Sequence, residues 1–467
     1  MKTVRLIASA AFAAFFTTAA ALAAPGDIVV KAGKSSGPIK PMNGVNNGPT
    51  RPGISQQRGN FEAYKAARIP FARTHDAAFC ASYGGEHTVD ITAVFPDFSK
   101  DVNDPSAYDF LMTDRYLATI QEAGTEVFFR LGQKIEHGPK KYGIMPPADF
   151  QKWAEICEHV IRHYTEGWNH GFRWPIRYWE IWNEADNDTE TWRTNPICWG
   201  GPAEMFDEFY ATAAKHLKKC FPQLKIGGPA LCWDEDWAER FFTYQESHGV
   251  PIDFFSWHCY TNSPDYIAEK ATRMRALADK HGYTAAETNL NEWNYIRNWT
   301  DEFVYSLKVI GGLKGAAFIA SVMSACQDRP VDILMYYDAR IDTSFNGLFD
   351  TTTLAPRQGY YAIYAWSKLA MLGTEVEVTE EDPDIYVTAA KGADGRLGVL
   401  ISRFNEDDNV VASRKYTVKF PDNVPKAGFV NAYMTDSVRS FTEIPLFVKG
   451  GEVEVLLEPN SFIYIEF

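Results

Sequence analysis

The 467-residue sequence lacks paired cysteine motifs, an excess of positive charge and, after its first residues, any long apolar run. Its seven cysteines are scattered without a Cys-x-x-Cys pair, which argues against a zinc knuckle or a dense disulfide framework. One or two disulfides stay open, with at least one thiol unpaired. Gly, Pro or charged residues interrupt each later apolar stretch, so we expect no membrane span. The net charge of −14 argues against nucleic acid as the main partner.

Residues 1–23 have the pattern of a secretory signal peptide. Lys2 and Arg5 precede a mostly apolar run over residues 6–20, and Ala21-Leu22-Ala23 forms a small-residue cleavage site. We therefore expect a mature chain that begins near Ala24 and is secreted or periplasmic. The remaining length is more than one domain usually has, which favours one large domain and one small domain.

Between residues 41 and 372, short apolar runs alternate with helical patterns, the clearest of them over residues 149–169. This alternation is typical of a parallel sheet, and eight repeats of the unit predict a closed (β/α)8 TIM barrel. An open doubly wound sheet is the alternative, but no glycine-rich nucleotide fingerprint supports it. The eight predicted strands cover residues 42–46, 69–73, 127–131, 176–183, 224–229, 252–260, 284–292 and 331–337.

The pattern changes after residue 372, where short and often alternating segments are separated by turn residues. This predicts a C-terminal antiparallel β-sandwich over residues 373–467. Residues 24–40 form an N-terminal segment whose apolar run at 27–31 could add an edge strand to the sandwich. The predicted sandwich strands cover residues 385–391, 396–404, 414–420, 428–436, 452–457 and 461–467.

Two Asn-Glu pairs carry the predicted chemistry, Asn183-Glu184 at the end of the fourth strand and Asn291-Glu292 at the end of the seventh. Active sites of such barrels gather at the C-terminal ends of the strands, so both carboxylates are expected to face one pocket. Double-displacement hydrolysis of a glycosidic bond needs such a pair, one carboxylate to attack the anomeric carbon and one to shuttle the proton. A helix N-terminal acid or a rim salt bridge is the alternative for each glutamate taken alone.

In these motifs the sequence resembles glycoside hydrolase family 39, within the superfamily of retaining (β/α)8-barrel glycosidases called clan A. Trp182-Asn183-Glu184 is similar to the acid/base motif on strand four, and Asn291-Glu292-Trp293 looks like the nucleophile motif on strand seven. The resemblance extends to residues 73–76 after strand two, residues 255–260 on strand six and the stretch at 347–349. It covers most of the barrel in the same order, together with the trailing sandwich.

The resemblance implies that Glu184 is the acid/base and Glu292 the nucleophile. Because no set of ligands stands at a recognised spacing, we expect neither a metal nor another cofactor. Glu184 is expected to hold a proton beside Trp182 and the charge of Glu292, while Tyr260 and Arg73 keep Glu292 ionised. Once Glu292 is glycosylated, Glu184 can take a proton from water. Substrate contacts are expected from Asn183, at the sugar 2-hydroxyl, and from Arg73, His75, His258, Tyr260, Trp293 and Tyr337.

Several of these residues have rival interpretations. His258 could be a buried, hydrogen-bonded structural histidine, and with Cys259 it does not suggest a metal site, because neighbours on a strand point to opposite faces. Glu180 is interpreted as structural, and Glu287 would need a register shift to replace Glu292 as nucleophile. Tyr337 stands near the place where the superfamily usually has a tryptophan that floors the sugar site, so the identity of the sugar stays open.

The leading hypothesis is a secreted retaining glycoside hydrolase that cleaves a poly- or oligosaccharide from its end, such as a xylosidase or an arabinosidase. Its expected partner is a carbohydrate substrate, and the oligomeric state is left open. One alternative is a carbohydrate-binding protein without activity, although such a protein does not need two like charges in one pocket. The other alternative is a transglycosylase, which product analysis with added acceptor sugars separates from a hydrolase.

Overall fold

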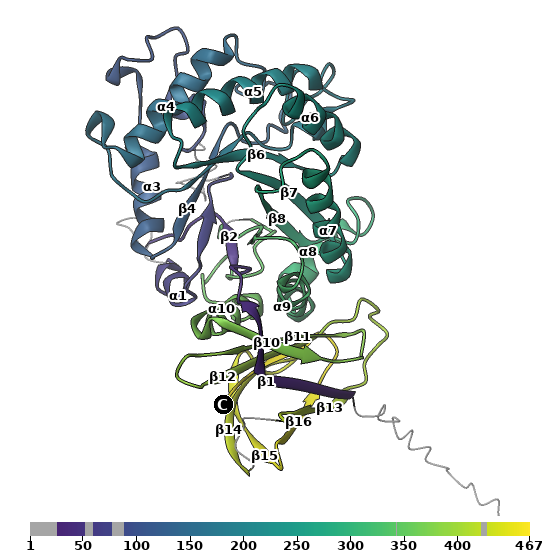
Figure 1. Cartoon of the computed structure of the whole chain (residues 1–467). Coiled ribbons are helices and arrows are strands. Elements are labelled where there is room, and N and C mark those ends of the chain that lie inside the picture. Colours follow the sequence, from purple (N-terminus) through teal and green to yellow (C-terminus); the bar gives the residue numbers. More distant parts are fainter. Residues whose placement is uncertain (1–25, 52–58, 77–87, 342, 422–426) are drawn as a thin grey trace, which may run out of the picture.

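The computed structural model describes residues 26–51, 59–76, 88–341, 343–421 and 427–467, so the predicted signal peptide lies outside it. Two closed β-barrels make up the described chain (Figure 1). In the first barrel eight parallel strands follow one another in chain order, from β2 to β9, with helices packed around them. The predicted (β/α)8 barrel is therefore confirmed.

All eight predicted strands of this barrel are present, and each of their ends lies within three residues of its predicted position. Their near-continuous apolar runs are explained by burial on both faces, against the barrel interior and against the surrounding helices. The strands are β2 Gly44–Asn46, β3 Phe71–Arg73, β4 Glu126–Leu131, β5 Tyr178–Ile181, β6 Lys225–Leu231, β7 Phe254–Thr261, β8 Glu287–Tyr295 and β9 Ile333–Tyr336.

The helix predicted over residues 149–169 is α4, which begins after Asp149 and ends before Gly167. The Asp149 side chain caps it by accepting the Lys152 N–H at 2.9 Å, and Gly167 leaves the helical region with φ of 83°. The α-helices are α1 Phe61–Ala66, α2 Ile91–Val94, α3 Leu111–Glu122, α4 Phe150–Thr165, α5 Ala203–Cys220, α6 Glu235–Ser247, α7 Pro264–Lys280, α8 Phe303–Ile310, α9 Leu313–Gln327 and α10 Gln358–Leu372.

The interior of the first barrel changes from apolar to charged along the strands. Phe128 and Tyr178 belong to a buried apolar cluster formed by the strands. Two residues further along, on the same faces, stand the buried Arg130 and Glu180. Side chains two apart on a strand share a face, so this order places apolar packing toward the strand starts and the charged groups toward the strand ends, where the site lies.

The C-terminal part forms a second closed barrel in the order β1-β10-β11-β12-β17-β14-β15-β16-β13. The predicted β-sandwich is confirmed as a β-domain, but its sheet closes because β1 pairs antiparallel with β10 and parallel with β13. Strand β1 therefore lies between two strands and not at an edge. The strands are β1 Gly26–Pro38, β10 Thr374–Thr379, β11 Ile385–Lys391, β12 Leu397–Arg403, β13 Arg414–Lys419, β14 Ala427–Thr435, β15 Thr442–Lys449, β16 Glu452–Leu457 and β17 Ser461–Glu466.

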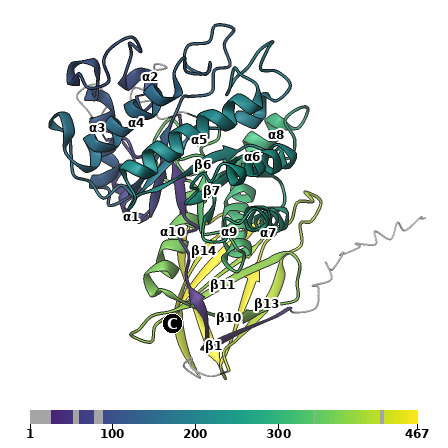
Figure 2. The same ribbon diagram turned by 45° about the horizontal axis from the view of Figure 1, so that its top comes forward.

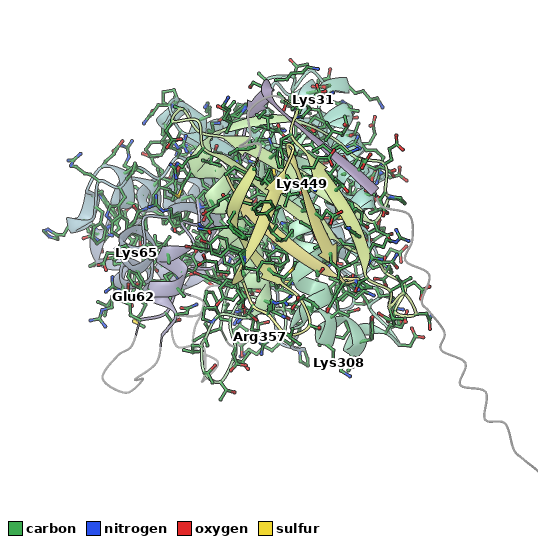
Figure 3. All side chains as sticks on the ribbon, turned by 90° about the horizontal axis from the view of Figure 1, so that it is seen from below. Lys31, Glu62, Lys65, Lys308, Arg357 and Lys449 are labelled. Carbon is green, nitrogen blue, oxygen red and sulfur yellow. The ribbon has the colours of Figure 1, made fainter. Side chains whose placement is uncertain are left out.

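Helices α9 and α10 lie between the two barrels and contact β11 and β12 (Figure 2). Across this boundary the hydroxyl groups of Ser321 and Ser402 lie 3.0 Å apart. Seen from below, Lys449 lies over the second barrel and Lys65 of α1 lies to its side (Figure 3). Within the described ranges no single helix is long and apolar enough to span a membrane, although α8 and α9 together, bent by 78°, pass the same test of length and composition.

Candidate active site

The chain leaves strand β5 in an unusual backbone conformation that places Glu184. Trp182 and Glu184 have positive φ angles of 71° and 49°, a region that costs a non-glycine residue about 1–3 kcal/mol. Both neighbouring strands hold this segment, since the Trp182 N–H donates to Leu131 O at 2.7 Å and the Glu184 N–H donates to Ala230 O at 3.0 Å. The indole of Trp182 also donates to Cys198 O at 2.9 Å. These bonds offset the backbone strain and fix the position of Glu184.

Glu292 lies inside strand β8, which continues to Tyr295, and so does not end its strand as the sequence suggested. The pairing of β8 with β7 shifts by one residue after Leu290. His258 therefore lies opposite Glu292, whereas a regular register would place it opposite Asn291. A bulge of this kind redirects side chains and is common beside active sites. Here it turns Glu292 and His258 to the same face.

His258 lies between the two glutamates. Its Nδ1 atom is 2.6 Å from Glu184 Oε1 and 2.8 Å from Glu292 Oε2. One carboxylate oxygen of each glutamate and one nitrogen of the ring all lie within 4.8 Å of one another. The exposed fractions are 0% for His258, 5% for Glu184 and 3% for Glu292. The structure therefore brings both Asn-Glu carboxylates together in one buried site.

The charges of this site depend on one another. Burial lowers the pKa of His258, but the charge of Glu292 and the hydrogen bond to Glu184 outweigh burial and raise this pKa to about 9. Burial raises the pKa of Glu292, but the charge of His258 outweighs it and lowers this pKa to about 2. At neutral pH an imidazolium ion therefore faces an ionised Glu292.

Arg73 connects the site with the buried polar residues Glu180 and Asn46 in the barrel interior. Its guanidinium donates to Glu180 Oε2 at 2.7 Å, to Asn183 Oδ1 at 2.6 Å and to Asn46 Oδ1 at 3.2 Å. The same group lies 3.8 Å from Glu292 Oε2. Because Asn183 Oδ1 is occupied in this way, its amide group is fixed, and Nδ2 is buried without a hydrogen-bond partner in the described ranges. Glu180 thus holds Arg73 in position, which is consistent with the structural role expected from the sequence.

The predicted residues Tyr260, Tyr337 and His75 form one aromatic side of the site. Tyr260 shares a hydrogen bond with Glu292, and burial together with that charge raises the pKa of the phenol well above its ordinary value, so Tyr260 stays protonated. The Tyr337 ring lies 6.3 Å from that of Tyr260 and 6.4 Å from that of His75, and its hydroxyl donates to Asp76 at 3.0 Å. Burial lowers the pKa of His75 to about 3, so this ring is neutral at neutral pH.

Trp293 is not part of the site, which corrects the expectation from the sequence. Its ring lies 5.4 Å from Tyr336 and 6.3 Å from Phe318 of α9, so it packs the outer wall of the barrel. The reason is strand geometry, because Glu292 faces inward and the next residue must face outward. Glu287, the rival nucleophile, stands at the start of β8 and pairs with Lys225 at the other end of the barrel.

Two loops that hold Glu184 in place were not predicted from the sequence. Asp186 accepts three backbone N–H groups of residues 232–234 at 2.9–3.1 Å, and Asp188 accepts those of residues 197–199. The second loop brings Cys198 Sγ to 3.9 Å from Glu184 Oε2. The visible signal was the acidic pattern Glu184-x-Asp186-x-Asp188. Its side chains tie two neighbouring loops to the segment after β5.

Two expectations concern metals and disulfides. Glu184, His258 and Glu292 are close enough to hold a metal ion, but a protonated His258 has no free electron pair on Nδ1 for a ligand bond. This argues against a metal at the site, and the expected absence of a metal stays a prediction because no observation of the described residues tests it. The six cysteines in the described ranges are free thiols, and Cys80 lies outside those ranges.

Comparison with known proteins agrees with the geometry. The model of glycosyl hydrolases family 39 matches residues 27–331. A β-xylosidase of Caldicellulosiruptor saccharolyticus is 23% identical over an alignment 393 positions long, which covers 76% of this chain and 77% of that protein. A glucosidase structure from Croceicoccus marinus has a TM-score of 0.76 and is 22% identical in sequence. The superposition covers 95% of this chain and 99% of the glucosidase chain.

A β-xylosidase structure from Caulobacter crescentus CB15 has a TM-score of 0.69 at 15% identity, with 95% of this chain and 99% of that chain covered. At such identities the solved structures support the fold alone. The family match, in contrast, spans well over half of the chain and includes both Asn-Glu pairs. This protein is a glycosidase, and its chain belongs to glycosyl hydrolase family 39.

Proposed function

We propose that this glycosidase is a retaining enzyme in which Glu292 is the nucleophile and Glu184 the acid/base. The observation that carries the proposal is the short distance between the carboxylates, whose nearest oxygens lie within 4.8 Å. Retaining glycosidases have carboxyl groups about 5–5.5 Å apart, whereas inverting enzymes need about 6.5–9.5 Å to admit a water molecule. The distance supports direct attack on the sugar.

In the first step Glu292 attacks the anomeric carbon, and the bond from this carbon to the leaving oxygen breaks. Glu184 gives its proton to that oxygen, and the sugar stays bound to Glu292 as an ester. Oε1 of Glu184 accepts a hydrogen bond from His258, so the proton to be donated belongs on Oε2. In the second step water attacks the anomeric carbon, Glu184 takes a proton from this water, and the bond from this carbon to the Glu292 oxygen breaks. Glu292 is released as a carboxylate.

The residues around the carboxylates fit this sequence of steps. The imidazolium of His258 and the guanidinium of Arg73 keep Glu292 ionised before attack. The free Nδ2 group of Asn183 is a fixed donor for the sugar 2-hydroxyl, an interaction that strengthens toward the transition state. Fixed donors of this kind act without reorganisation during the reaction, which is the main source of electrostatic catalysis.

The proposed substrate is a glycan that carries xylose or arabinose at its end. Xylose is supported by the β-xylosidase relative, and terminal action is supported by the burial of both carboxylates, which suits a closed pocket more than an open groove. Tyr337 directly follows the last barrel strand, where the superfamily usually has a tryptophan, so the sugar itself is left to a substrate screen. The signal-peptide pattern at residues 1–23 supports a secreted or periplasmic enzyme.

The test is to record the anomeric configuration of the first product by ¹H NMR. Aryl glycosides of xylose, arabinose, galactose, glucose and uronic acids identify the substrate first. Retention of configuration is the expected result, and inversion would refute the assignment of Glu292 as nucleophile. Added acceptor sugars separate hydrolysis from transglycosylation, because the same carboxylates would serve both reactions.

A further inference from the structure

Trp299 is an exposed tryptophan beside the candidate active site. Of the thirteen tryptophans, only Trp299 and Trp233 are exposed, with exposed fractions of 57% and 61%. The Trp299 ring meets the ring of Tyr260 edge to face, with centroids 5.3 Å apart. Tyr260 in turn shares a hydrogen bond with Glu292. A line of aromatic rings therefore leads from the nucleophile to the surface.

The segment around Trp299 is held in place by its own side chains. The indole stacks on Phe303 at 5.5 Å with an angle of 26° and lies 6.2 Å from Phe345. Asn298 accepts the N–H groups of Thr300 and Glu302 at 3.0 Å each, which fixes the turn before α8. The indole is thus exposed on one side and packed on the other.

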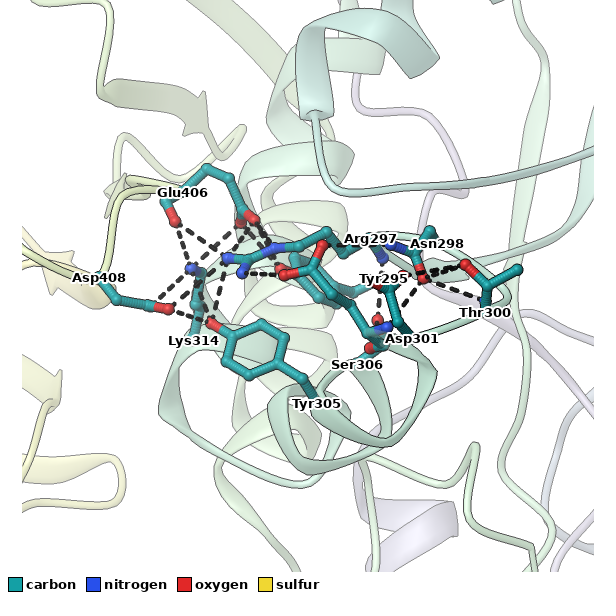
Figure 4. Close-up of polar contacts among 11 residues, drawn as sticks. Tyr295, Arg297, Asn298, Thr300, Asp301, Tyr305, Ser306, Lys314, Glu406 and Asp408 are labelled. Atoms are coloured by element: carbon teal, nitrogen blue, oxygen red, sulfur yellow. Dashed lines mark hydrogen bonds and ion pairs between the residues drawn. The ribbon is translucent and has the colours of Figure 1, made fainter.

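The second barrel anchors the same segment from outside (Figure 4). The Arg297 guanidinium donates to Glu406 at 2.6 Å, and the Tyr295 hydroxyl donates to the same carboxylate at 2.8 Å. Lys314 at the start of α9 pairs with Asp408 at 2.9 Å. Residues 295–297 and Lys314 are therefore tied to the loop that follows β12.

This arrangement immobilises an apolar ring that remains open to water. Rigid exposed aromatic rings bind ligands well because the binding partner does not have to order them. One face of a sugar ring carries C–H groups that pack on an indole, while its hydroxyl groups stay in water or bond to polar groups. Because both carboxylates are buried, the rest of a longer glycan must extend from the site toward the protein surface.

We infer that Trp299 is a stacking platform for the sugar on the leaving side of the cleaved bond. This inference rests on the proposed glycosidase reaction and adds a binding subsite to it. Its ligand is a sugar ring of the same glycan, one residue beyond the sugar that becomes attached to Glu292.

The test compares substrates with and without a leaving sugar. Trp299→Ala should lower kcat/KM for a disaccharide or trisaccharide about tenfold or more, while Trp299→Phe should keep most of it. The glycosyl fluoride of the same sugar has no leaving ring, so its hydrolysis by Trp299→Ala should stay within about twofold of wild type. An equal loss on the fluoride, or no loss on the oligosaccharide, would overturn the inference.

Phe429→Ala is the control, because it removes an exposed aromatic ring of the second barrel, in strand β14. It should show no dependence on the leaving sugar, and a dependence confined to this variant would overturn the inference. Isothermal titration with Glu292→Ala and with the Glu292→Ala, Trp299→Ala double variant measures oligosaccharide binding without turnover. A loss of about tenfold in affinity is expected in the double variant. If wild type hydrolysed none of the substrates, the proposed function would fail, whereas equal affinities would refute the platform alone.

Discussion

The Nδ1 atom of His258 lies 2.8 Å from Oε2 of Glu292, in a site where both side chains are buried. An ion pair this close and this poorly solvated ties the ionisation of each group to the other. The candidate nucleophile therefore owes its negative charge at acidic pH mainly to a histidine on the neighbouring strand.

Replacing His258 with asparagine should move the acid limb of the pH profile. The variant loses the cation that lowers the pKa of Glu292 to about 2, while burial continues to raise this pKa. More of the nucleophile is then protonated at a given acidic pH, so kcat/KM should begin to fall at least about one pH unit higher than in wild type. The profile is measured on an activated aryl glycoside. An acid limb at the same pH in both proteins would contradict the role given to His258.

The same pair should make stability depend on pH. Folding raises the pKa of His258 from 6.5 to about 9, so its contribution to stability is complete below pH 6.5 and is lost as the pH rises through 9. Folding lowers the pKa of Glu292 from 4.5 to about 2, so its contribution is present above pH 4.5 and is lost as the pH falls through 2. Wild type should therefore lose more Tm between pH 6.5 and 9 than His258→Asn. Parallel curves in thermal unfolding would refute this coupling.

Replacing each of the two glutamates should reduce the activity in a different way. Glu292→Ala should abolish turnover of every substrate, and azide should restore part of it with a product of inverted configuration. Glu184→Ala should slow substrates with poor leaving groups by about 10²–10⁴-fold but spare those with good leaving groups. Glu287→Ala makes the same chemical change at the other end of β8 and should stay active. If it behaved like Glu292→Ala, the assignment of the nucleophile would be wrong.

The contact between the barrels should contribute to stability. Glu406 accepts bonds from Tyr295 and Arg297, and its side chain is 30% exposed, so Glu406→Gln should lower the free energy of unfolding by roughly 1–3 kcal/mol. Glu454→Gln removes a surface carboxylate that pairs with Lys415, and its effect should stay below about 0.5 kcal/mol. Denaturant unfolding measures both variants, and equal effects would show that the contact adds nothing.

Much of the fold could be predicted from the sequence because the barrel strands are buried on both faces and appear as short apolar runs. Strand β10 was missed because it is short and follows α10 directly, although its alternating charged and apolar residues are typical of a strand. Strand β15 was missed because Pro445 argues against a paired strand. The parallel pairing of β1 with β13 joins residues nearly 400 positions apart, and no local pattern indicates it.

The site was predictable to a lesser degree. The positions of Glu184 and Glu292 follow from strand order, because both motifs stand near the ends of inward-facing strands. The place of His258 between them depends on a bulge that shifts the register of β7 and β8, which the sequence does not reveal. Trp293 was assigned to the substrate from its motif, although the alternation of side chains along a strand already placed it outside.

The proposed attack of Glu292 on the sugar can be tested by trapping the covalent intermediate. A 2-deoxy-2-fluoro glycoside with a good leaving group, made from the sugar that the enzyme accepts, should trap the covalent intermediate because its second step is slow. Peptide mass spectrometry then locates the attached sugar. We expect one label per chain, on the peptide that contains Glu292, and its disappearance in Glu292→Gln. A label on Glu184, Glu180 or Glu287, or turnover without any covalent intermediate, would contradict it.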